Sequence, residues 1–183
     1  LGNNSTVSTN LPVYVVDTTG TGNLSNIVSI VGGGLSAYAL SSDGKVYGWG
    51  DNTKGQLGIG NVNQILTPVK VLHPSDPSGY LNNVVSIAGG YMSAFALKSD
   101  GTVWSWGEND YRGQLGDNTA IQRETPIQVN GLDGVGYLSD ISSISSGYGF
   151  AFAVQNDGTV WGWGLNANKQ IGDGVTLHRD TPV

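Results

Sequence analysis

Short runs of alternating apolar and polar residues, separated by glycine, predict β-strands along the chain. The clearest example is a β-branched run at 83–89, NVVSIAG, followed by SAFALK at 93–98. The SDGT at 99–102 is typical of a tight hairpin turn, because Asp accepts backbone hydrogen bonds and Gly adopts positive φ. A third strand follows at 102–107, and TPIQV at 125–129 forms a fourth, with Pro tolerated at its start. No stretch sustains a helical period, so the pattern predicts an all-β fold.

This four-strand pattern recurs along the chain. The segments that begin at Ile27, Val84 and Ile141 align with one another, at successive offsets of 57 residues. About four strands in a unit of this length are typical of a β-propeller blade. We expect about three blades of four-stranded antiparallel sheet, as a partial propeller or a segment of a larger or oligomeric ring or array. The repeats divide the chain into the end of a preceding blade repeat and three repeats, at 1–16, 17–72, 73–129 and 130–183.

The side-chain pattern within each unit predicts that blades pack face to face. Residues i and i+2 of a strand share a face, so Trp104 and Trp106 point one way and Ser105 the other. The strand before them, at 94–97, alternates Ala with Phe or Leu. The other two units have the same alternation. We therefore expect the bulky side chains of one blade to fill the space left by the small side chains of the next.

One motif, DGxVxxWGxNxxGQLGxG followed by Pro, recurs in the three units. Its repeated positions are an Asp-Gly turn, a Trp-Gly pair and a loop Gln. They fall at Asp43, Gly44, Trp49, Gly50 and Gln56; at Asp100, Gly101, Trp106, Gly107 and Gln114; and at Asp157, Gly158, Trp163, Gly164 and Gln170. This pattern resembles the repeat of the regulator of chromosome condensation family, over nearly the whole chain. The third copy departs at Lys169, which replaces a loop Gly, and we expect a locally different loop there.

The resemblance implies a fold more sharply than a function. Members of that family close seven blades into a ring, and they include guanine-nucleotide exchange factors, ubiquitin-pathway proteins and a bacterial inhibitor of β-lactamase. A shared fold does not settle function. Three blades leave one bulky and one small-residue face uncovered, and heterologous faces of this kind build rings or open filaments. We therefore expect either a segment of a longer repeat protein or a subunit that self-associates through its blade faces.

The amino-acid composition limits the classes of partner and binding site that the chain can have. The formal net charge is −6, with only 8 Lys and Arg residues, which opposes direct binding of nucleic acid. The absence of Cys excludes disulfides, thiolate metal sites and Cys nucleophiles. No apolar run approaches the ~20 residues of a membrane span. The Asn, Thr, Ser and Gly content, with few Lys and Arg, favours a secreted or cell-surface bacterial protein.

Catalytic and ligand-binding patterns are sparse. The Gly-rich loop after Trp49 lacks the Lys-Ser/Thr of a phosphate-binding loop and the ligand spacing of a calcium loop. The repeated Asp-Gly positions are interpreted as turns. Asp173, His178 and Asp180 lie close in sequence, yet no nucleophile elbow accompanies them. We expect no enzyme activity, no catalytic residues, no cofactor and no metal site.

The loops that differ between repeats are where binding is expected, because loops on a rigid scaffold carry function. The candidate partner-binding residues are Tyr111, Arg112, His73, His178 and Arg179. The sequence favours a non-catalytic module for protein–protein interaction or structural assembly. The alternatives are a regulator of a small GTPase resembling a guanine-nucleotide exchange factor, a secreted enzyme inhibitor of the β-lactamase-binding type, and a self-assembling filament subunit. A further possibility is that Asn, Gln and Trp side chains form a surface that binds carbohydrate. The same-face Trp pairs argue against it, because we expect them to lie in the interior.

Overall fold

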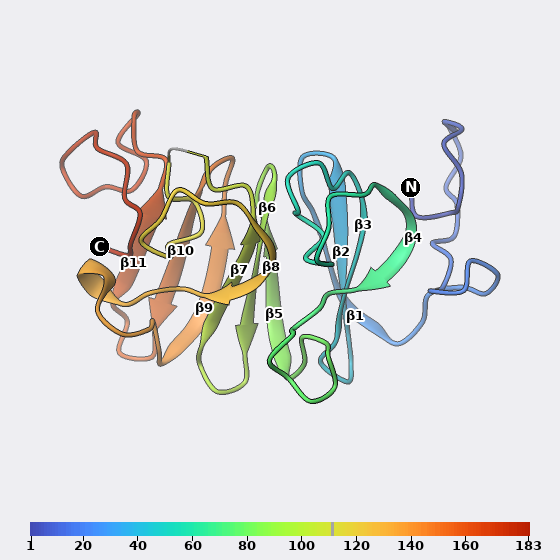
Figure 1. Ribbon diagram of the computed structural model, residues 1–183, viewed down its shortest axis with the longest axis horizontal. Helices are drawn as coiled ribbons and strands as arrows, with labels where there is room; N and C mark the ends of the chain where they lie inside the picture. The colour runs from blue at the N-terminus through green and yellow to red at the C-terminus, as the bar shows by residue number, and fades with distance from the viewer. Residues whose placement is uncertain (111) are drawn as a thin grey trace.

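Three antiparallel sheets stand side by side in a row in the computed structural model, which describes residues 1–110 and 112–183 (Figure 1). Each sheet is one blade, and its strands pair in chain order. The first blade contains β1 (Ile27–Gly32), β2 (Ser36–Ser41), β3 (Val46–Gly50) and β4 (Ile65–Lys70). The second contains β5 (Val84–Gly89), β6 (Ser93–Lys98), β7 (Val103–Gly107) and β8 (Arg123–Gln128). The third contains β9 (Ile141–Ser146), β10 (Phe150–Gln155) and β11 (Val160–Gly164). The expected all-β partial propeller of about three blades is confirmed.

The third blade has three strands rather than the expected four. The chain nevertheless returns along the edge of β11, where Gly162 and Val183 exchange backbone hydrogen bonds of 3.0 and 3.1 Å. Gly164 and Arg179 do the same at 2.6 and 3.0 Å. These contacts occupy the position that β4 and β8 hold in the other blades. A 3-10 turn at Leu132–Gly134 (η1) lies in the connection between β8 and β9.

The register of each hairpin places a large side chain beside a small one. Ala37 of β2 lies opposite Trp49 of β3, and Tyr38 lies opposite Gly48. The second blade pairs Ala94 with Trp106 in the same way. One face of each blade therefore carries Trp beside Ala, and the other carries an aromatic ring beside a residue as small as Gly or Ser. The complementarity expected between blades thus operates within each sheet as well.

The hydrophobic core consists of two layers, one at each junction between blades. In the first layer Tyr38 and Leu40 pack with Ala94, Ala96 and Trp106 of the next blade. The Tyr38 and Trp106 rings meet edge to face, with their centroids 6.4 Å apart. This arrangement is favourable by roughly 0.5–1.5 kcal/mol beyond the area it buries. Large side chains therefore do fill the space above the small ones, as the alternation predicts.

The second layer repeats the arrangement between the middle and third blades. Phe95 packs with Trp163 at a centroid distance of 6.1 Å, again edge to face. Ala151 and Ala153 lie in the same cluster and are almost fully buried. The inner strands also meet across the junctions, since β5 contacts β1 and β9 contacts β5. The blades consequently converge along β1, β5 and β9.

Polar contacts join each blade to the next. The backbone carbonyl of Gln56 accepts hydrogen bonds of 2.7 Å from the Tyr38 hydroxyl and from Nε1 of Trp106. The Gln114 carbonyl accepts from Nε1 of Trp163 at 3.1 Å. The loop must approach the indole closely for this contact. A Cβ at Gly58 would lie 2.9 Å from the Trp106 ring. The glycine after the Gln-Leu pair is therefore required by interblade packing.

The Asp-Gly hairpin turns also connect neighbouring blades. The Gly44 carbonyl accepts a 3.0 Å hydrogen bond from the amide of Val84, and the Gly101 carbonyl accepts one of 3.1 Å from Ile141. Each turn at the end of β2 or β6 thus binds the first residue of the next inner strand. The repeated glycines therefore serve the junction between blades as well as the turn.

A buried Asn organises the long loop that follows the third strand of each blade. Oδ1 of Asn52, Asn109 and Asn166 accepts the amide of the residue after the loop Gln, at 2.9 to 3.0 Å. All three side chains are fully buried. The third loop keeps this geometry although Lys169 replaces glycine, because Lys169 itself adopts a positive φ of 59°. The expectation of a locally different loop at Lys169 is therefore wrong, and the residue instead carries the backbone strain.

Candidate partner-binding surface

The long loops after β3 and β7 share one end of the blades with the short loops inside the β1–β2 and β5–β6 hairpins. The amide of Asp51 donates to the carbonyl of Leu35 at 3.0 Å, and Glu108 donates to Met92 at 2.8 Å. In Figure 1 these loops lie along the upper edge of the row of sheets. The hydrogen bonds hold the loops in fixed positions, so this edge presents a defined surface.

A hollow of about 460 Å³ lies on this edge, between the first and second long loops and the inner hairpins. We define its lining as the loop-face patch, which consists of Lys54, Tyr91, Met92, Glu108, Asp110, Arg112 and Tyr148. The patch draws residues from all three repeats and contains one of the residues expected from the sequence, Arg112.

An aromatic stack forms the apolar part of the patch. The rings of Tyr91 and Tyr148 lie 4.6 Å apart with an interplanar angle of 26°. Tyr148 keeps 58% of its surface exposed. The carbonyl of Tyr91 accepts a 2.9 Å hydrogen bond from Gly34, where a Cβ would lie 2.5 Å from the Tyr91 ring. Gly34 therefore gives the first tyrosine room to lie flat beside the second.

Charged side chains border the stack. Nζ of Lys54 donates to a carboxylate oxygen of Asp110 and lies 3.8 Å from Glu108. The hydrogen bond to Asp110 raises the pKa of the Lys54 ammonium, so the lysine is charged at neutral pH. All three side chains are partly exposed, and such pairs add at most about 1 kcal/mol to stability. These pairs instead fix the orientation of the two long loops relative to each other, because they connect the loop of one blade to the loop of the next.

His73, His178 and Arg179 do not line this patch. His73 is buried at the outer edge of the middle blade, with its ring 4.5 Å from that of Trp104. Nδ1 of His178 accepts the amide of Asn166 at 3.0 Å. Tyr111 lies outside the described residues. The structure therefore separates candidates that the sequence grouped together as variable loops, and their role in partner binding stays a prediction.

Arg179 takes part in a pair that repeats between blades. Its Nε donates to Asp173 at 2.7 Å, and Arg123 donates to Asp117 through Nε and Nη2 at 2.9 and 2.7 Å. The two pairs occupy equivalent positions in their loops. Sequence reasoning overlooked both these pairs and the Tyr91–Tyr148 stack, although a Gly-Tyr step at the same repeat position could have indicated the stack.

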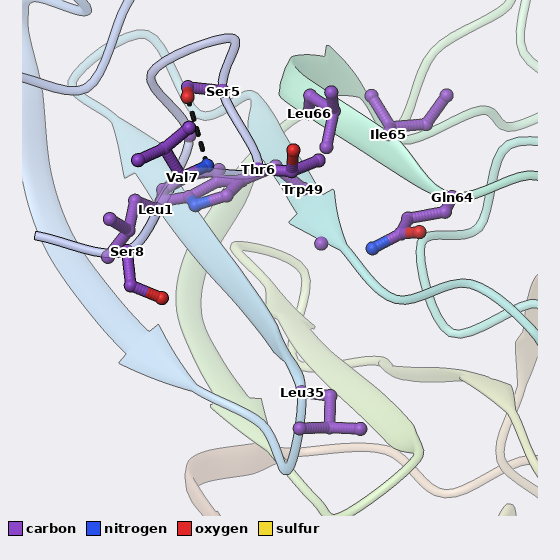
Figure 2. A pocket seen from close by; sticks show the side chains of 12 residues that line it. Leu1, Ser5, Thr6, Val7, Ser8, Leu35, Trp49, Gln64, Ile65 and Leu66 are labelled. Atoms are coloured by element: carbon purple, nitrogen blue, oxygen red, sulfur yellow. Dashed lines mark hydrogen bonds between the residues drawn. The ribbon is translucent and has the colours of Figure 1, made fainter.

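A further hollow, of about 250 Å³, lies where the segment 1–8 crosses the first blade (Figure 2). Gly2 lies against Trp49 there, because a Cβ at Gly2 would be 2.8 Å from Nε1 of the indole. This contact reproduces the one between Gly58 and Trp106. The side chains labelled in Figure 2 are apolar or neutral, and Ser5 accepts the amide of Val7 at 3.1 Å. The hollow is thus lined by residues that make the same Gly–Trp packing contact as the other repeats.

Within residues 1–110 and 112–183, His, Cys, Asp and Glu form no cluster that could hold a metal ion. The described part of the chain also holds no helix of the length and hydrophobicity that a membrane span requires.

The hairpin aspartates are engaged in their own turns. The hydroxyl and the amide of Thr102 donate to Asp100 at 2.6 and 3.0 Å, and the side-chain bond, followed by the backbone bond, lowers the pKa of the Asp100 carboxyl.

Similarity to known proteins agrees with this architecture. The family model described as the regulator of chromosome condensation repeat matches residues 43–97 and 100–154. A second model of the same description matches 27–56, 84–114 and 141–170. The crystal structure of Prp20p from Saccharomyces cerevisiae is similar with a TM-score of 0.71 and 25% sequence identity, over 87% of this chain and 38% of that one.

Curated relatives are much longer than the matched region. The probable E3 ubiquitin-protein ligase HERC6 of Homo sapiens is 31% identical over 163 residues, which are 86% of this chain and 15% of HERC6. The ultraviolet-B receptor UVR8 of Arabidopsis thaliana is 29% identical over 157 residues, 86% of this chain and 33% of UVR8. The chain therefore spans a third or less of these two relatives. The expected secreted or cell-surface bacterial origin stays a prediction. With the family model matching more than half of its residues, the chain belongs to the regulator of chromosome condensation repeat family.

Proposed function

We propose that this chain is a non-catalytic repeat β-propeller module that binds a protein partner through the loop-face patch. The observation that carries the proposal is the Tyr91–Tyr148 stack, partly exposed and bordered by Lys54, Glu108 and Arg112. Tyr and Arg are enriched among the residues that dominate binding energy at protein interfaces. An exposed aromatic centre with a charged border is the arrangement of such an interface.

The rigidity of the surrounding loops supports the same proposal. Asn52 and Asn109 hold the two loops internally, and the Gln56 carbonyl holds the first loop against the next blade. A surface that is ordered before binding loses less conformational entropy when the partner docks. The patch is therefore suited to a folded partner with a complementary surface.

The similarity to Prp20p favours protein partners as a class. That structure was described together with the binding of Prp20p to Gsp1p and histones. A net charge of −6 makes direct binding to nucleic acid an unfavourable alternative for this chain.

The test begins with affinity capture on the purified chain and continues with the captured protein in purified form. Replacing Tyr148 and Arg112 together by Ala is expected to weaken binding at least about tenfold, as the truncation of central interface residues does. Tyr14→Ala removes a tyrosine that is 79% exposed outside the patch, and it is the matched control. A dissociation constant unchanged by the double substitution would contradict the proposal.

A regulator of a small GTPase, resembling a guanine-nucleotide exchange factor, is the second candidate. Its support is the likeness to Prp20p, which was described as binding Gsp1p. The release of a fluorescent guanine nucleotide from purified candidate GTPases measures this activity directly. Acceleration that depends on the loop-face patch would favour the second candidate, whereas unchanged release rates would remove it.

A further inference from the structure

Another hollow lies beside β8, the outer strand of the middle blade. It measures about 530 Å³, and we call it the outer groove. The residues that matter for its chemistry are His73, Trp104, Pro126, Gln128, Asn130 and Tyr137. It shares no lining residue with the loop-face patch.

The charge balance of the outer groove favours a neutral ligand. Arg123 and Asp117 also line it, but they form a two-point ion pair through Nε and Nη2 at 2.9 and 2.7 Å. The two charges offset each other, and the carboxylate side chain is only 6% exposed. Phosphate or acidic ligands therefore gain little here, because the guanidinium is already bound.

Several polar side chains in the groove have hydrogen-bonding capacity to spare. Within the described part of the chain, no hydrogen bond involves the side chain of Gln128, Asn130 or Tyr137. Their polar atoms are not sealed away from solvent, and Tyr137 is 61% exposed. Amides and a phenol can each donate to a ligand carbonyl. The groove thus combines aromatic and proline walls with unused donors.

The surroundings of Trp104 disfavour a sugar ring as the ligand. The Trp104 ring contacts His73 at a centroid distance of 4.5 Å, and Nζ of Lys98 lies 5.7 Å from its centroid. Its Nε1 already donates to Thr102 at 3.1 Å. The ring is half-buried, so little flat aromatic surface is open for stacking. Trp106 is fully buried, as the sequence pattern led us to expect for the Trp pairs, whereas Trp104 reaches the groove.

We propose that the outer groove binds an extended, proline-rich peptide segment of a partner protein. A polyproline II chain has no internal hydrogen bonds, so its backbone carbonyls need external donors. Its rings dock in grooves lined by aromatic side chains, and its stiffness keeps the entropy cost of binding low. Tyr137 and Pro126 supply the apolar walls, and Gln128 and Asn130 supply donors.

The first blade offers an internal comparison. A hollow of about 380 Å³ lies beside β4 at the same position in the repeat, with Pro68 and Tyr80 in place of Pro126 and Tyr137. Nζ of Lys70 lies 5.1 Å from the centre of the Tyr80 ring. No His or Trp lines this hollow. The middle blade is therefore the expected binding site, and the first blade provides a matched control.

The test uses a synthetic array of fluorescent peptides with a fixed Pro-Xaa-Xaa-Pro core and varied flanking residues, and glycine–serine peptides of equal length. Anisotropy with the whole chain should show binding of a subset of proline-containing peptides only. Tyr137→Ala and Gln128→Ala should each weaken that binding, Tyr137→Ala by about tenfold. Tyr80→Ala should leave it unchanged.

The outcome is independent of the loop-face patch. Tyr148→Ala should not alter peptide binding, so the failure of one proposal leaves the other intact. Absence of binding across the whole array would overturn the outer-groove proposal, as would equal binding of glycine–serine peptides. Binding that survives Tyr137→Ala would also overturn it. Saccharide binding on a glycan array that is lost in Tyr137→Ala, without peptide binding, would assign the groove to sugars instead.

Discussion

Nε1 of Trp106 donates a 2.7 Å hydrogen bond to the backbone carbonyl of Gln56, a residue that lies 50 positions earlier in the chain. The bond is fully buried and crosses the junction between two blades. It is therefore a polar contact on which the placement of the first long loop depends.

Trp106→Phe removes the donor and part of the ring while keeping an aromatic side chain. We expect a loss of about 2 kcal/mol in the free energy of unfolding, from the lost hydrogen bond and the space left behind. Urea unfolding measures the change. Trp104→Phe is the control, because that indole is half-buried and donates to Thr102, and it should cost less than about 1 kcal/mol. Equal losses would show that the bond to Gln56 has no special role.

Gly58→Ala tests the close approach of the loop to the indole. The added Cβ would lie 2.9 Å from both the Trp106 ring and Cγ1 of Val71, at a φ of 66°. We expect destabilisation by about 2 kcal/mol or more. Gly136→Ala separates strain from crowding, because Gly136 has a φ of 65° and no atom within 4 Å. It should lose only about 1 kcal/mol in thermal or urea unfolding. A similar loss in both variants would mean that packing against Trp106 does not matter.

Lys169→Gly is expected to stabilise the third blade. Lys169 adopts a φ of 59°, a left-handed conformation that glycine reaches without steric cost. The expected gain is about 1 kcal/mol in the free energy of unfolding. Ser145→Gly, within the regularly paired part of β9, should instead destabilise the protein by about 1 kcal/mol. A loss of stability on Lys169→Gly would show that the lysine side chain makes a compensating contribution.

Acid should weaken the hairpin turns. The bonds from Thr102 lower the pKa of Asp100 below its ordinary 3.8, so the folded protein binds this proton less readily than the unfolded chain. The resulting stability is present above pH 3.8 and is lost as the pH falls through the lower, folded pKa. Unfolding in urea at a series of pH values from neutral downwards tests this sign. Asp100→Asn should reduce the pH dependence, and an unchanged slope would show that Asp100 does not contribute.

The blades could be predicted from the sequence because their determinants are local and repeated. The Asp-Gly turns and the alternation around Trp106 lie within single units, and both recur at the 57-residue offset between units. The register then follows, since a slip of one residue would turn Trp106 away from Ala94 and the core. Even the packing of Tyr38 against the next blade follows from the alternation of large and small side chains.

The surfaces could not be predicted in the same way because they depend on how separate repeats meet. Tyr91 and Tyr148 are one repeat apart and stack only because the inner hairpins converge. The contact of Lys54 with Asp110 likewise joins two loops 56 positions apart. At Lys169 the sequence predicted a change that the structure does not have. The hydrogen bond to Asn166 preserves the turn, although the conformational preference of lysine alone would have altered it.

The bond between Gln56 and Trp106 also bears on how such a chain can grow by duplication. In the middle copy the donor Trp106 and the acceptor Gln114 lie close together in sequence, yet Trp106 binds the carbonyl of Gln56 in the copy before it and Gln114 accepts from Trp163 in the copy after it. A duplicated unit inserted between two others therefore brings its own indole donor and its own carbonyl acceptor. Units of this kind can be added or reordered while the donor and the acceptor at each new junction between blades remain hydrogen-bonded. The sequences of the loops can then diverge toward different partners.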